Sequence, residues 1–233
     1  RALASPGGGA AFDPEPLGAS GRAAEVARCM LLARSTLDAL AARQPGLRAG
    51  LRSPARNLLA QRDVLLRRIG QAGMGPGPAR RTRVHGALGL GQVLRALDDF
   101  VFIGFGGSSA AAFAAGRSKG VPLRDVAGML QSISRARLDA LRRLGPPADG
   151  SPALRRLAKA WETQVRQAFL VAHDAAAAEP ALPWAGSWLW LYEAEAALLA
   201  LQSALQPLAD DLQVPLQALA ELLARPDASP QPE

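Results

Sequence analysis

The chain contains the sequence Arg83-Val-His-Gly-Ala-Leu-Gly-Leu-Gly-Gln-Val-Leu94, followed after five residues by Phe100-Val-Phe-Ile-Gly-Phe-Gly-Gly107. This pattern has the spacing of a phosphotransferase active site. Phosphoryl transfer needs a carboxylate that accepts the substrate proton, an amide a few residues later that holds a metal ion, and a second acid beyond a hairpin. Position 87 would carry the base, Gln92 the amide, and position 104 the metal-binding acid. Positions 87 and 104 are alanine and glycine, so the framework lacks its acids.

The framework continues in both directions and is specific enough to indicate a family. It comprises His85-Gly86-x-x-x-Leu90-Gly91-Gln92-Val93-Leu94-Arg95, Asp98-Asp99-Phe100-Val101, x-Phe105-x-Gly107 and Arg117-x-Lys119-x-x-Pro122-Leu123-Arg124-Asp125-Val126-Ala127-Gly128-Met129-Leu130. These segments resemble the maltokinases, bacterial kinases that make maltose 1-phosphate, over a length far beyond that of a short motif. Weaker similarity at Phe12–Pro16, Ala160–Thr163 and Val214–Leu216 extends the resemblance over nearly the whole chain, but only to the C-terminal lobe of such a kinase.

The departures from the family fall on its polar site residues. The family's HGD is His85-Gly86-Ala87 here, its HLGQ is Gly89-Leu90-Gly91-Gln92, its DFEGEP is Gly104 to Ser109, and its RPLxERR is Ala111 to Arg117. The resemblance therefore implies that catalytic residues are absent, the degenerate positions being Ala87, Gly89, Gly104, Gly106 and Ser108. It implies no cofactor-binding or metal-binding residue, with Gln92 a remnant of the metal site. Structural remnants are His85, Arg117, Lys119, Arg124 and Asp125.

Two of these remnants have expected structural roles. We expect His85 to hydrogen-bond within the loop, and Arg124 with Asp125 to form an ion pair at a helix start that buttresses the loop. ATP and Mg²⁺ are cofactors of the family, but we expect neither here, because an amide without carboxylates binds hard cations weakly.

The predicted fold class is α+β and predominantly α-helical. The resemblance makes it a kinase-like C-lobe of the aminoglycoside-phosphotransferase type, with a small β hairpin and with the N-lobe absent. Residues 1–19 are predicted to be a linker or ragged N-terminus, 20–225 the maltokinase-like C-lobe, and 226–233 a disordered tail. Helical periodicity predicts a helix over Arg22–Arg43. Ser53-Pro54 and Ser151-Pro152 each predict a helix start.

The remaining elements follow from turn residues and periodicity. We expect a loop over Gly73–Arg83, a short strand at Arg83–His85, and a hairpin between Gln92 and Phe105 around Leu97-Asp98-Asp99. Further helices are predicted over Leu123–Leu144, Pro152–Ala178, Ser187–Leu205 and Val214–Leu223.

Composition limits the function classes. The net charge of +7 comes almost entirely from arginines that are spread along an Ala/Gly-rich chain, so we predict a solvated surface and no nucleic-acid partner. The single cysteine, Cys29, excludes an intrachain disulfide and favours a cytoplasmic location. The most apolar stretch, Trp184 to Leu205, contains Glu193 and Glu195, which argues against a membrane span. The N-terminus lacks an apolar signal core. Because it also lacks Met, we expect an excerpt of a longer chain.

Three functions remain open at this level. The first is a pseudokinase-like structural or interaction module linked to trehalose, maltose and glycogen metabolism. Its partner would be an upstream N-lobe or a trehalose-synthase-like domain or subunit, because maltokinase-type domains also occur fused to trehalose synthase. The second is part of an active maltokinase, with Asp98, Asp99 or Asp125 replacing the lost acids. The third is a saccharide-binding module, which tryptophans facing the position 87 cleft would favour and tryptophans in the helical core would oppose.

Overall fold

The computed structural model describes residues 12–74, 77–105, 119–145, 151–176, 185–206 and 211–226. Most of these residues are helical. The helices are α1 (Ala19–Arg43), α2 (Ala49–Ala60), α3 (Arg62–Ala72), α5 (Leu123–Leu144), α6 (Pro152–Ala176), α7 (Ala185–Ala204) and α8 (Gln213–Leu223), with short 3-10 turns at Gln44–Gly46 and Leu90–Gln92. The predominantly helical class with a small β component is confirmed.

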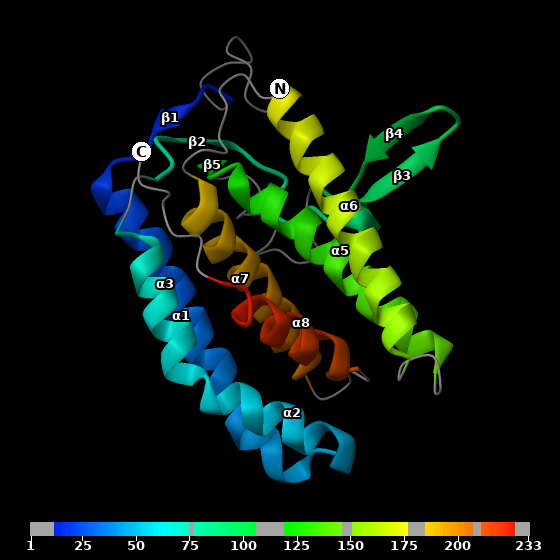
Figure 1. Cartoon of the computed structure of the whole chain (residues 1–233). Helices are drawn as coiled ribbons and strands as arrows, with labels where there is room; N and C mark the ends of the chain where they lie inside the picture. Colours follow the sequence, from blue (N-terminus) through cyan, green and yellow to red (C-terminus); the bar gives the residue numbers. More distant parts are fainter. Residues whose placement is uncertain are drawn as a thin grey trace.

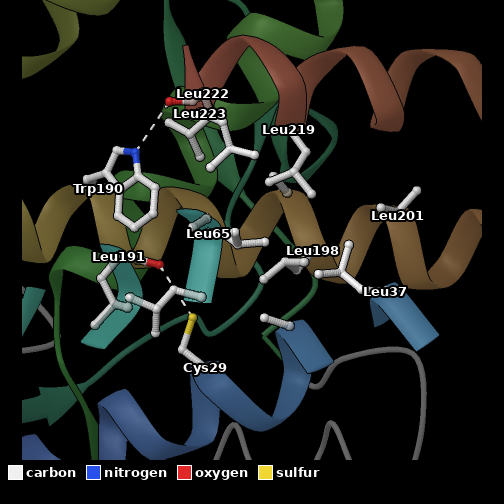
Figure 2. Packing of buried hydrophobic residues seen from close by; sticks show 14 of the residues in the cluster. Cys29, Leu37, Leu65, Trp190, Leu191, Leu198, Leu201, Leu219, Leu222 and Leu223 are labelled. Atoms are coloured by element: carbon white, nitrogen blue, oxygen red, sulfur yellow. Dashed lines mark hydrogen bonds between the residues drawn. The ribbon is translucent and has the colours of Figure 1, made fainter. Parts of the chain in front are cut away.

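Helix α7 is the centre of the core (Figure 1). It contacts α1, α3, α5 and α8, and its side chains are buried on nearly every side because its sequence is apolar around the whole circumference. Figure 2 shows how it is packed: the Cys29 thiol of α1 faces the Leu191 carbonyl at 3.9 Å, and the Trp190 indole N–H donates to the Leu222 carbonyl of α8 at 3.4 Å. The core therefore joins residues from both ends of the chain.

The strands form two separate sheets. Strand β2 (Arg80–Arg83) pairs antiparallel with β1 (Glu15–Pro16) and with β5 (Lys119–Gly120). Strands β3 (Val93–Ala96) and β4 (Asp99–Phe102) form an antiparallel hairpin that projects from the helices (Figure 1). Within the segment 1–19, predicted to be a linker, Glu15 and Pro16 thus join a sheet and Leu17 is buried; residues 1–11 lie outside the described part.

Several predicted elements agree with the structure. The hairpin turns at Leu97 and Asp98, α5 has the predicted ends, and α6 begins at Pro152, where the N–H of Leu154 donates to the Ser151 hydroxyl at 3.4 Å. Helices α1, α7 and α8 begin one to three residues before the predicted starts. The predicted end of α6 at Ala178 lies outside the described residues.

Two predicted boundaries are wrong. Pro54 does not start a helix but lies inside α2, which begins at Ala49 because Leu51 packs into the core. The carbonyl of Gly50, which would have accepted the missing N–H, is on an exposed residue and can bond water instead. The strand predicted at Arg83–His85 instead spans Arg80–Arg83, so the loop predicted over Gly73–Arg83 ends before Arg80 and Val84 and His85 lie beyond the strand. The cause is pairing with Glu15 and Pro16, which draws the chain into the sheet earlier.

Candidate functional site

The start of the loop that follows β2 is bound by the carboxylate of Asp125. Asp125, in the first turn of α5, accepts the backbone N–H of His85 at 2.6 Å and that of Gly86 at 2.8 Å, one on each oxygen. Gly86 has φ of 82°, a left-handed conformation that favours glycine. Burial raises the pKa of Asp125, and the two backbone hydrogen bonds act in the opposite direction. Asp125 therefore contacts the loop as expected.

The imidazole of His85 connects the loop to the end of the hairpin. Its Nε2 lies 2.7 Å from the carbonyl oxygen of Ile103, and its Nδ1 lies 3.3 Å from the N–H of Ala87. A carbonyl can only accept and an amide can only donate, so the geometry fits a neutral ring with the proton on Nε2. The ring also packs against Phe105, with centroids 4.7 Å apart. These are the contacts of a structural hydrogen-bonding residue.

The loop is packed tightly on α5. A Cβ on Gly128 would lie 2.4 Å from the Leu88 carbonyl oxygen, and one on Gly89 would lie 3.2 Å from the Cβ of Ser132. The Ser132 hydroxyl also accepts the N–H of Leu90 at 3.0 Å. A side chain at position 89 would thus meet α5.

The three positions expected for the reaction come together around this loop. Ala87 is exposed on the loop, and Gln92 follows in the 3-10 turn before β3. Gly104 has φ of 85°, and a Cβ there would lie 3.4 Å from Gln92 Cγ and 3.9 Å from His85 Cε1. Gln92 holds the hairpin base through its backbone, since its carbonyl accepts the N–H of Ile103 at 2.9 Å. The framework is therefore assembled, but position 87 carries only the methyl group of alanine and position 104 only the hydrogen atom of glycine.

No alternative acid is gathered at this loop in the described part of the chain. Within the ranges that the structure describes, no group of three or more His, Cys, Asp or Glu side chains could hold a metal ion. Asp98 and Asp99 lie at the exposed tip of the hairpin, where an Asp99 oxygen accepts the N–H of Phe100 at 2.7 Å. Asp125 is occupied by the two amides. Gly106, Ser108 and Arg117 lie outside the described residues.

Arg124 does not pair with Asp125, which corrects the expected ion pair at the start of α5. Its guanidinium turns to α1 and α7, with Nη2 at 2.7 Å from Glu25 and Nε at 3.3 Å from Glu195. The reason is the burial of Glu195, which requires a cation beside it. Lys119 lies in β5 and pairs with Glu15 of β1 at 2.7 Å.

A second charged cluster, which the sequence did not reveal, ties α6 to the core. Glu162 is buried and accepts hydrogen bonds from Ser134, from Arg137 Nε at 2.8 Å and from Lys159 Nζ at 2.7 Å. The one feature of the sequence that pointed to this cluster was the weak similarity of Ala160–Thr163 to the maltokinases. The cluster is structural, because its charges are paired with one another.

Two of the three tryptophans that the structure describes lie in the core and not at the loop. Trp188 and Trp190 are buried in the core, which opposes the saccharide-binding hypothesis by the criterion set above. Trp161 is 44% exposed on α6, and Trp184 lies outside the described residues. Across the described ranges, no helix is both long enough and apolar enough to cross a bilayer.

The architecture matches solved kinases. A glucosamine kinase in complex with glucosamine, ADP and inorganic phosphate superposes with a TM-score of 0.69 at 19% identity, covering 90% of this chain and 46% of that one. Two further crystal forms of glucosamine kinase give TM-scores of 0.72 and 0.69 at 19% and 20% identity, each covering 91% of this chain and 48% and 46% of theirs. No family model matches the sequence. The chain thus has a kinase-like fold and spans about half the length of the kinases that it matches.

Proposed function

We propose that this chain is a catalytically degenerate kinase C-lobe of the maltokinase type that serves as a structural or interaction module. Phosphoryl transfer depends on positioning and on neutralising charge with metal ions. The chain has the loop, the hairpin and the amide of such a site, but Ala87 and Gly104 can neither accept a proton nor bind a metal.

One observation supports the proposal: the described loop and hairpin keep a closely packed arrangement around positions 87 and 104, which carry alanine and glycine. His85, Asp125, Gly128 and Ser132 keep the loop in a closely packed arrangement. The described aspartates nearest in sequence are engaged by backbone amides or lie at the hairpin tip. A fold that keeps this packing without the acids is suited to binding a partner rather than to catalysing phosphoryl transfer.

The partner that we propose is a polypeptide, and the metabolic context is that of maltose, trehalose and glycogen. The kinases of similar fold are about twice as long, which fits an upstream N-lobe or a trehalose-synthase-like domain or subunit as the missing cover of the loop face. The described loop residues Ala87, Leu90 and Gly104 are exposed, so this face is available for such a cover. ADP is bound by one of these glucosamine kinases, yet the lost acids lead us to propose no nucleotide cofactor here.

The test is a phosphotransfer assay with the purified chain, Mg·ATP and either maltose or glucosamine. We expect no sugar phosphate above a heat-inactivated sample, while an intact maltokinase under the same conditions supplies the positive control. Formation of maltose 1-phosphate would support the active-kinase alternative and overturn the proposal. Maltose binding by calorimetry without turnover would instead support a saccharide-binding module.

A further inference from the structure

The net positive charge of the chain is concentrated at one corner of the fold. Arginines occur along the whole sequence, but residues 43–68 contain seven of them and a single acid, Asp63, so this segment carries six of the seven net charges. It comprises the end of α1, all of α2 and the start of α3, and Figure 1 shows it at the lower end of the molecule, away from the hairpin β3–β4. Charge of one sign that is gathered in one place raises the local concentration of oppositely charged partners.

Three of these arginines form a row along the exposed side of α2. Arg48 precedes the first turn, and Arg52 and Arg56 follow at four-residue intervals, which places them on one side of the helix about 6 Å apart along its axis. Within the described ranges, the side chains of Arg48 and Arg56 make no hydrogen bond or ion pair, and that of Arg52 donates only to the Leu47 carbonyl, at 2.8 Å. The row therefore has no carboxylate partner in the part of the chain that the structure describes.

The side chains beside this row are small. Ala49 and Ser53 are exposed, and a Cβ on Gly50 would meet no atom within 4 Å. Small side chains let the backbone of a second helix approach closely, while the longer arginines reach to its side chains. The same surface is poorly suited to other anions: residues 43–68 contain no aromatic side chain on which a base could stack, and the exposed side of α2 has no large apolar side chain that could enter a membrane.

A cavity lies at the beginning of the row. Its volume is about 180 Å³, roughly that of six water molecules, which accommodates one side chain. The described residues that line it include Leu47, Leu51, Ala204 and Leu212, together with Arg43 and Arg48. The Arg43 guanidinium donates to the carbonyls of Leu205 and Gln206, and these neutral acceptors leave its charge uncompensated. The lining therefore fits a side chain with an apolar stem and a carboxylate end.

We propose that the exposed side of α2 is a docking surface for an acidic α-helix of a partner polypeptide, with carboxylates at four-residue intervals facing Arg48, Arg52 and Arg56. A guanidinium binds a carboxylate through two parallel hydrogen bonds, and two helices share the same axial repeat of about 6 Å per four residues. One acidic side chain of the partner enters the cavity between Arg43 and Arg48. This inference rests on the proposed function as an interaction module and gives it a second contact surface, separate from the loop face.

The test is binding of two synthetic alanine-based peptides of about 20 residues to the full chain, measured by fluorescence anisotropy and circular dichroism. One peptide carries glutamate at every fourth position, and the other has the same composition with glutamate at every fifth position, which distributes the carboxylates around the helix. We expect the first to bind at least about fivefold more tightly and more weakly as salt is added. It should also gain helicity when bound, because like charges at four-residue spacing destabilise the free helix.

Two double variants locate the binding surface. Arg48→Gln with Arg56→Gln removes both ends of the row, and neither side chain contacts another described part of the fold through a hydrogen bond or ion pair. The control is Arg135→Gln with Arg156→Gln, which removes two exposed charges that have no ion pair among the described residues of α5 and α6. We expect the first to weaken peptide binding about tenfold or more and the control less than about twofold.

Four results would overturn the proposal: no peptide binding at low salt, equal binding of the two peptides, equal losses in the two double variants, or tighter binding of another anion through Arg48 and Arg56. The other anions are an oligouridylate and vesicles that contain phosphatidylserine, and tighter binding of either would assign the corner to RNA or to a membrane. Phosphotransfer by the chain would overturn the proposed function and leave these measurements unchanged, so the two failures can be told apart.

Discussion

The carboxylate of Asp125 lies 2.6 Å from the backbone nitrogen of His85, a residue forty positions earlier in the chain. This contact, with its counterpart to Gly86, connects the first turn of α5 to the loop that would carry the catalytic base. The loop conformation therefore depends on a side chain in the first turn of α5.

Replacing Asp125 by asparagine should destabilise the fold. An amide offers one acceptor oxygen and directs its NH₂ group at the second N–H, so one charge-assisted bond is lost and one repulsive contact is gained. We expect a loss of about 1.5–3 kcal/mol in the free energy of unfolding, measured by urea titration. Asp98→Asn at the exposed hairpin tip is the control and should change stability by less than about 0.5 kcal/mol. Equal effects of the two changes would contradict the role assigned to Asp125.

Gly128 and Gly70 should respond in opposite ways to the same substitution. Both lie inside helices, where alanine is normally preferred by about 0.5–1 kcal/mol. At Gly70 of α3 the nearest atom to a new Cβ is Met30 Cε at 3.8 Å, so Gly70→Ala should stabilise the fold. At Gly128 the Cβ would meet the Leu88 carbonyl oxygen at 2.4 Å, so Gly128→Ala should destabilise it. Thermal unfolding of both variants tests the packing of the loop; a gain of stability at Gly128 would refute it.

The ion pairs of Glu162 should make the fold sensitive to acid. Burial acts to raise its pKa, but hydrogen bonds from Lys159 and Ser134 and the charges of Lys159 and Arg137 outweigh it, and the pKa lies below the ordinary 4.5. The unfolded chain therefore takes up the proton first, and the stabilising contribution is lost as the pH falls through and below about 4.5.

Glu162→Gln should thus lower stability at neutral pH by about 1.5–3 kcal/mol and flatten its decline between pH 5 and pH 3. The measurement is the free energy of unfolding at a series of pH values. Asp38→Asn removes an exposed ion pair with Arg62 and should leave the decline of the free energy of unfolding at low pH nearly unchanged. An unaltered pH profile in Glu162→Gln would show that another group governs acid unfolding.

The thiol of Cys29 should be unreactive in the native protein. It is buried between α1 and α7, and burial raises its pKa to about 12. The reactive thiolate is therefore scarce at pH 8. We expect no colour with a thiol-specific disulfide reagent under native conditions and one equivalent per chain in denaturant. Rapid native labelling would mean that the α1–α7 contact opens readily.

Mg·ATP should not raise the melting temperature. A ligand stabilises a protein only through its affinity for the folded state, and the positions that would hold the metal carry no acid. Differential scanning fluorimetry with and without millimolar Mg·ATP measures this, with an intact maltokinase as the responsive control. A clear upward shift would reveal a nucleotide site that the described loop does not provide.

The sequence predicted those elements whose ends are marked by local chemistry. Helix α5 has its predicted limits because Pro122 precedes it and Gly145, with φ of 67°, ends it. Pro152 marked α6 in the same way, whereas the identical Ser-Pro pair at Pro54 misled, since burial of Leu51 extends α2 backwards. The two-residue strands β1 and β5 were missed because they exist only through pairing with β2, a contact between distant segments.

In the candidate site, too, the features with a local sequence signal were predicted, and the contacts between distant segments were missed. The framework around Gln92 was visible as spacing, and the contact of Asp125 with the loop was expected from the resemblance. The direction of Arg124 was not, because it depends on Glu25 and Glu195, which are far away in sequence. Clearances such as that at Gly128 also depend on how closely two backbones approach, and no residue pattern encodes that distance.

The central position of α7 bears on how the chain is synthesised. Residues 185–204 form the surface on which α1, α3 and α5 pack, and Glu195 provides the partner of Arg28, 167 residues earlier. A ribosome delivers α1 and α3 first, so their apolar sides stay unpaired until α7, which begins more than a hundred residues after α3 ends, has been made. During translation they present the cell with a long-lived nascent chain of the kind that chaperones bind, and a transcript truncated before α7 should yield protein that is degraded rather than folded.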